Sequence, residues 1–225
     1  MSELWSYGLS DFLLFSPRVY YRLFELHNRA LWPAQILTSA LGVTILYLLV
    51  RRPLNRGHRA IPAILGALWI WIAWAFLWQR YATINWASAY MAPIFVMQGL
   101  SLIWIGTVRR ALVFAQGREI RDFMGLAILT LSIFVYPVIA PLMGRPWWAT
   151  EVFGIVPDPT ALATLAVLSL SRSRTRWLLF PIPLLWCAIS GATLWVMGAG
   201  EFLIAPVGAF ARFAIAVVGN SRDPR

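Results

Sequence analysis

The sequence predicts an all-α fold: a polytopic membrane helix bundle of about seven transmembrane helices with an N-terminal amphipathic interfacial helix. The 225 residues are 60% apolar and 12% charged, with a mean hydropathy of +0.70, whereas soluble domains average about 45–50% apolar and about 25% charged. The apolar residues also gather in runs of about 20, the length that crosses a bilayer as a helix. This composition argues against a soluble globule and a disordered chain. A disulfide scaffold is excluded because the chain has one cysteine.

Residues 1–30 are expected to form an arm that lies on the bilayer and leads into the first span. Ser16-Pro17 is typical of a helix start, with an N-cap followed by proline in the first turn. The next residues place an apolar face beside a charged one: Val19, Leu23, Leu26 and Ala30, then Arg18, Arg22, Glu25 and Arg29. Glu25 is spaced to pair with Arg22 and Arg29. This pattern is typical of an interfacial amphipathic helix.

Seven apolar segments are predicted to form a single transmembrane bundle over residues 31–221, followed by a tail at 222–225. Five of the segments carry no charge: 31–50, 60–78, 87–107, 123–142 and 177–197. The other two, 152–171 and 202–221, contain Asp158 and Arg212 respectively. A central arginine costs roughly 2.5–3.5 kcal/mol on insertion scales, so 202–221 either spans the membrane or lies in its interface. Between spans, 143–157 with Trp147-Trp148 resembles a second interfacial segment.

The basic residues indicate the orientation, and all 19 of them are arginine. If the connection 51–59 is cytoplasmic, alternating spans place 109–121 and 172–176 on the same side. These three connections contain four, four and three arginines, whereas the opposite connections contain only Arg80 and Arg145. With seven spans, thirteen arginines lie inside and five outside, which satisfies the positive-inside rule better than six spans do. The N-terminus is therefore expected outside and the C-terminus inside.

No motif in the chain points to catalysis, so we expect it not to be an enzyme and to have no cofactor and no metal site. Its two histidines, His27 and His58, lie outside the uncharged spans, and there is no glycine-rich phosphate loop with a lysine. No ligands have zinc or copper spacing. The net charge of +10 would suggest nucleic acid for a soluble protein, but here topology accounts for the arginines. The expected partners are the lipid bilayer and other membrane subunits or a second copy, and no nucleic acid.

Five residues form the candidate intramembrane polar site: Arg212, Asp158, Glu201, Gln35 and Gln98. An arginine at mid-depth needs a partner or a water-filled pocket, and Asp158 and Glu201 are the acids nearest to apolar segments. Glu201 precedes Arg212 by eleven residues, about 16 Å along one straight helix, so only Asp158 could pair with it directly. Alternatively, Arg212 snorkels to the interface. The two glutamines either join helices or line a solute pathway.

The opening stretch resembles a known family over Leu4-Trp5-Ser6-Tyr7, 11–17 (DFLLFSP), 23–29 (LFELHNR) and 32–35 (WPAQ). The family consists of small multi-pass bacterial inner-membrane proteins grouped as a domain of unknown function, some of them labelled permease automatically. The resemblance is sharpest over the first 35 residues, implies a bacterial inner membrane, and transfers no catalytic residue. The proline-interrupted spans, together with Gln35, Gln98 and Arg212, favour a small permease or channel-like solute transport protein. The alternative hypothesis is a non-catalytic structural or assembly subunit of a larger membrane complex.

The arginine pattern predicts the outcome of a topology experiment. Reporter fusions within 109–121 and 172–176 are expected to report the same, cytoplasmic, face of the membrane, because both connections are arginine-rich. Paired alkaline-phosphatase and fluorescent-protein reporters measure this directly. Reporters on opposite faces would contradict the proposed threading.

Overall fold

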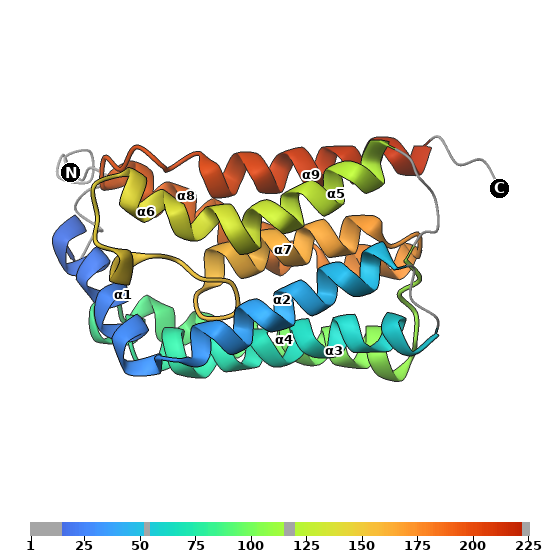
Figure 1. Ribbon diagram of the computed structural model, residues 1–225, viewed down its shortest axis with the longest axis horizontal. Coiled ribbons are helices and arrows are strands. Elements are labelled where there is room, and N and C mark those ends of the chain that lie inside the picture. The colour runs from blue at the N-terminus through green and yellow to red at the C-terminus, as the bar shows by residue number, and fades with distance from the viewer. Residues whose placement is uncertain (1–14, 52–54, 115–119, 222–225) are drawn as a thin grey trace, which may run out of the picture.

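The computed structural model describes residues 15–51, 55–114 and 120–221, with the backbone alone for 55–58, 120–121, 211–212 and 215–221. This part of the chain is built of helices packed side by side (Figure 1). The α-helices are α1 Pro17–Leu31, α2 Ala34–Val50, α3 Asn55–Ile72, α4 Ala87–Ser101, α5 Ile120–Thr130, α6 Tyr136–Leu142, α7 Pro157–Leu170, α8 Pro181–Val196 and α9 Ile204–Ser221. The predicted all-helical bundle is therefore confirmed at the level of secondary structure.

Short segments of other helix types extend several of these helices. The π-helical segments Ala73–Trp78, Leu102–Val108 and Leu131–Val135 continue α3, α4 and α5. The 3₁₀ segments are Tyr81–Thr83, Trp147–Ala149 and Arg174–Leu179. Among the described residues, four continuous helical stretches are long and apolar enough to cross a membrane: 59–83, 87–108, 122–142 and 174–196. The pair α1 and α2, bent by 90°, would count as a fifth.

The helix α7 is shorter than the predicted span 152–171 and occupies the centre of the bundle (Figure 1). Its 14 residues reach about 21 Å, less than the ~30 Å hydrocarbon core, because residues 152–156 form turns. Every residue of α7 is buried, and the helix packs against α5, α8 and α9. The prediction of a full-length helix here was wrong, since Pro157 and Pro159 start the helix only after the turns.

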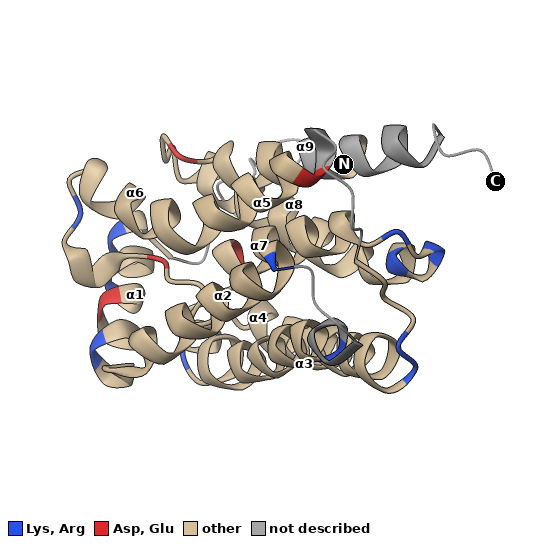
Figure 2. Cartoon of the chain, turned by 45° about the vertical axis from the view of Figure 1, so that its right-hand side comes forward, with Lys and Arg blue, Asp and Glu red and all other residues tan. Residues whose placement is uncertain are grey.

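Two arginine-rich connections, those that contain Arg109 and Arg172, meet at one end of the bundle. Phe114 and Ser171 form an isolated antiparallel bridge. The amide of Arg172 also donates to the carbonyl of Val113 at 2.8 Å. Figure 2 shows that charged residues lie mostly at the ends of the helices and in the connections, while most of the helical surface carries none.

The helix α1 lies across the opposite end of the bundle, at 90° to α2 (Figure 1). Ser16 caps it by accepting a hydrogen bond from the amide of Val19 at 3.4 Å, as the Ser16-Pro17 pair predicted. Of the predicted apolar face, Val19 and Leu26 are 44% and 46% exposed, whereas Leu23 is buried. The side chains that α1 buries are Tyr20, Leu23, Phe24, His27 and Asn28.

Contacts with the chain that follows α6 explain which face of α1 is buried. The 3₁₀ segment Trp147–Ala149 packs against α1, so the face bearing His27 and Asn28 turns inward. Glu25 pairs with Arg22 as expected, but Arg29 instead lies 5.8 Å from the centre of the Trp148 ring. Of the predicted interfacial segment 143–157, residues 143–148 are exposed or partly exposed. Residues 149–157 are buried, because they enter the bundle to reach α7.

The backbones of α3 and α4 approach each other closely at Gly66 and Gly99. A Cβ atom at either glycine would lie 2.6 Å from the carbonyl oxygen of the other. Gly66→Ala or Gly99→Ala is therefore expected to lower the free energy of unfolding by about 1–3 kcal/mol, because the helices must move apart. Thermal unfolding in mild detergent measures the change. Gly200→Ala is the matched control, since a Cβ there meets nothing within 4 Å; equal losses in all three variants would contradict the prediction.

Candidate functional site

A buried carboxylate, that of Asp158, lies at the start of α7 and accepts hydrogen bonds from two other helices. Trp186 donates from its indole Nε1 at 2.6 Å, and Ser190 donates from its hydroxyl at 2.5 Å, both from α8. Tyr136 at the start of α6 donates from its hydroxyl at 3.3 Å. Asp158 is 3% exposed. Three donors are an arrangement that can hold a charged carboxylate inside an apolar bundle.

The local sequence places this carboxylate at the first turn of α7. Pro157 fits the first turn of a helix, and an acidic group there is stabilised by the positive end of the helix dipole. Gly154 adopts φ +74°, and its amide donates to the hydroxyl of Thr160 at 2.8 Å. The same hydroxyl donates to the carbonyl of Val156 at 2.9 Å. These contacts fold the turn against α7 and aim Asp158 into the bundle.

A second acidic group, Glu201, lies at the bundle end that α1 covers. Its Oε1 accepts from the hydroxyl of Tyr21 at 2.9 Å and pairs with Nη2 of Arg145 at 2.7 Å. The Arg145 guanidinium also lies 4.1 Å from the centre of the Tyr21 ring. The Arg145 and Glu201 side chains are only 12% and 8% exposed. Nε and Nη1 of Arg145 are buried and have no hydrogen-bond partner among the described residues.

Glu151 lies in the turns before α7 and is affected by the charges of both Asp158 and Glu201. It is 8% exposed, and within the described chain its carboxylate makes no hydrogen bond or ion pair. Burial raises the pKa of Glu151 well above its ordinary value, and the negative charges of Asp158 and Glu201 raise it further, while Arg145 opposes the shift. The sequence reasoning missed Glu151 because it lies outside every predicted span. It follows the Trp147-Trp148 pair by three residues, in a stretch that the sequence predicted to lie in the interface.

The structure separates the five residues of the predicted site. Gln35 donates to the carbonyl of Asn28 at 2.8 Å, where α1 meets α2. Gln98 is fully buried in α4 and donates to the carbonyl of Leu179 at 3.0 Å. Arg212 belongs to α9, but its side chain lies outside the described residues. Asp158 is held by α6 and α8, and Glu201 by Arg145 and Tyr21. The charges of both carboxylates act on Glu151.

The turns that carry Glu151 are held by two polar residues of α1. Asn28 donates from Nδ2 to the carbonyls of Trp148 and Thr150, both at 2.8 Å. His27 lies with Nε2 3.4 Å from the carbonyl oxygen of Ile155. Burial lowers the pKa of His27 to about 4, and the charge of Arg80 contributes to the shift. His27 is therefore neutral at physiological pH.

The hydrogen-bonding and titratable groups lie on several helices, with no metal centre in the part of the chain that the structure describes. Among these residues, no three His, Cys, Asp or Glu side chains gather in a way that could hold a metal ion. The arrangement can take up or release a proton, or bind a cation, at the buried carboxylates. Trp186 was not predicted from the sequence as a partner of Asp158.

A family model, described as a family of unknown function (DUF6064), matches residues 17–222. The chain belongs to this family. The resemblance seen in the sequence is thereby confirmed, and it extends well beyond the first 35 residues. Searches of curated proteins and of solved structures give no match. The family name carries no activity, so function must be argued from the site.

The lowered pKa of His27 predicts how stability depends on pH. In the unfolded chain the imidazole takes up a proton near pH 6.5, whereas in the fold it does so near pH 4. Between these values the unfolded state binds more protons, so stability is full above pH 6.5 and falls as the pH drops toward 4. The loss reaches at most about 3 kcal/mol.

Thermal unfolding in mild detergent from pH 7 to pH 4 measures this dependence. His27→Gln is expected to flatten it, and His58→Gln, which removes the other histidine, is expected to leave it unchanged. An identical pH dependence in the wild type and His27→Gln would show that His27 is not the responsible group.

Proposed function

We propose that this chain is a multi-pass protein of the bacterial inner membrane and acts as a small permease or channel-like solute transport protein. In this proposal the N-terminus is periplasmic, the C-terminus is cytoplasmic, the partner is the lipid bilayer, and the protein catalyses no reaction. One observation carries the proposal: the carboxylate of Asp158, buried at the start of a shortened central helix.

An ionisable group inside a membrane bundle is costly, and such groups commonly mark pathways for ions, protons or solutes. Many transporters hold their substrate or coupling ion where a helix is interrupted part-way through the membrane. The helix α7 has this character, because turns lead into the bundle and the helix starts only at Pro157. Asp158 sits at that start and is hydrogen-bonded from α6 and α8.

Two further acidic groups, Glu151 and Glu201, are buried near the end of the bundle that α1 covers. Glu201 lies at the end covered by α1, paired with Arg145. Glu151 is close enough to both Glu201 and Asp158 for their charges to raise its pKa. Several buried acidic side chains in one bundle favour the passage of a proton or a cation rather than an anion.

The second candidate function is a structural or assembly subunit. The observation that favours it is that Asp158 accepts three hydrogen bonds, all from neighbouring helices, which is enough to join α6, α7 and α8 without any transport role. Under this hypothesis the carboxylate need not ionise, and the protein is expected to copurify with other membrane subunits in mild detergent.

The charge of Asp158 distinguishes the two functions. Asp158→Asn keeps the shape and one acceptor but removes the charge, so a transport role predicts at least about a tenfold loss of flux, of the size seen when an essential ionisable group is removed. The measurement is the osmotic response of proteoliposomes to glycerol, urea, ammonium chloride and potassium chloride. For at least one of these solutes, the wild type is expected to exceed protein-free liposomes.

Asp122→Asn is the matched control, since Asp122 is an acid at the other end of the bundle, 3.7 Å from Arg172. It is expected to keep its flux, and thermal unfolding verifies that each variant is folded. If Arg212 belongs to the pathway, Arg212→Ala abolishes flux in the same assay with folding intact. Full flux in a folded Asp158→Asn variant, or no flux above empty liposomes in the wild type, would contradict transport through this site.

A further inference from the structure

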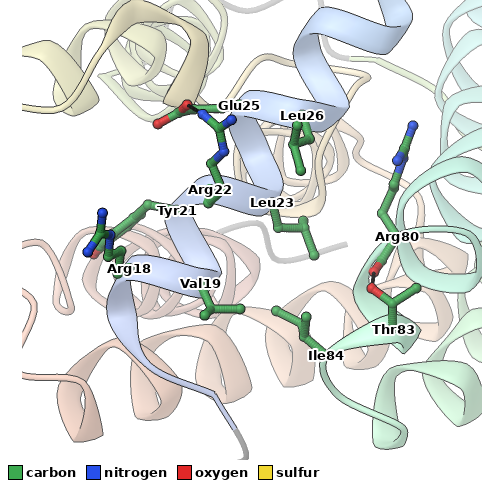
Figure 3. A pocket seen from close by; sticks show the side chains of 10 residues that line it. All are labelled: Arg18, Val19, Tyr21, Arg22, Leu23, Glu25, Leu26, Arg80, Thr83 and Ile84. Carbon is green, nitrogen blue, oxygen red and sulfur yellow. Dashed lines mark hydrogen bonds and ion pairs between the residues drawn. The ribbon is translucent and has the colours of Figure 1, made fainter.

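A groove of about 820 Å³ lies at the bundle end between α1 and residues 80–84 (Figure 3). Three arginines line it: Arg18 and Arg22 from α1, and Arg80 from the connection before α4. Glu25 pairs with Arg22. Within the described chain, the guanidinium groups of Arg18 and Arg80 have no acidic partner. The groove therefore carries a net positive charge.

Apolar side chains line the same groove. Figure 3 shows Val19, Leu23 and Ile84 between Arg18 on one side and Arg80 on the other. Val19 is 44% exposed although it is apolar. The groove therefore offers both positive charge and apolar contact to the same ligand.

The position of the groove agrees with this chemistry. Because α1 is perpendicular to α2, it lies in the plane of the membrane surface if α2 crosses the bilayer, which is the placement proposed above. Apolar faces of such helices sit at the boundary between headgroups and acyl chains. Arginine binds phosphate oxygens through paired N–H donors.

We propose that this groove binds one anionic phospholipid, with its phosphate at the arginines and an acyl chain along Val19, Leu23 and Ile84. A zwitterionic lipid offers the same acyl chains but carries a compensating positive charge, so it binds less well. A soluble phosphate offers the charge without the hydrocarbon and leaves the apolar part of the groove unfilled.

Native mass spectrometry of the full chain in detergent tests the proposal. Titration with dioleoyl phosphatidylglycerol is expected to give a one-to-one complex at least about tenfold tighter than with dioleoyl phosphatidylcholine. The double variant Arg18→Gln/Arg80→Gln is expected to lose this preference. The variant Arg18→Lys/Arg80→Lys is expected to retain part of it, because the charge remains without the bidentate geometry.

The matched control is Arg59→Gln/Arg109→Gln, which removes two exposed arginines at the opposite end of the bundle. It is expected to keep the preference for phosphatidylglycerol, and thermal unfolding verifies that every variant is folded. An equal loss in the control would show a general charge effect and overturn the proposal. Displacement of the lipid by millimolar inorganic phosphate would overturn it in favour of a soluble anion. Both outcomes are independent of the flux assay, so this site and the Asp158 site can fail separately.

Discussion

The enclosure of α7, with the carboxylate of Asp158 at its start, is the constraint on which the arrangement of the bundle depends. A carboxylate in an apolar interior must be hydrogen-bonded, and the donors come from α6 and α8. Those helices cannot move away from α7 without leaving the carboxylate unsatisfied. The remaining contacts of α7, all of whose residues are buried, then set where α5 and α9 can pack.

This constraint reaches the bundle end through the turns before α7. The turns must enter the interior, and their carbonyl groups need donors once they are away from water. Asn28 supplies two of these donors from α1, which explains why α1 buries polar residues on the face that packs against the turns. The position of α1 across the bundle end is therefore a consequence of how the chain enters α7. It also creates the groove with residues 80–84.

The apolar runs and the Ser16-Pro17 pair were sufficient to predict the helical bundle and the start of α1, because both depend on local sequence. Asp158 stood out for the same reason, as a charge within an apolar run. Its partners could not be predicted, since Trp186 and Ser190 meet it only through tertiary packing. Glu151 was missed because nothing in its local sequence shows that the turn around it is buried. The face that α1 buries against the turns could not be predicted either, because apolar periodicity ignores buried polar residues such as His27 and Asn28.

The arginines outside the three connections that the sequence predicts to be cytoplasmic need a separate explanation. The positive-inside rule accounts for the arginines of those connections but leaves Arg18, Arg22, Arg29, Arg80 and Arg145 at the end where it predicts few. Each of these therefore needs a local reason to be there. Arg145 pairs with Glu201, Arg22 with Glu25, and Arg29 lies over Trp148. Arg18 and Arg80 have no such partner within the described chain, and an anionic lipid would supply one.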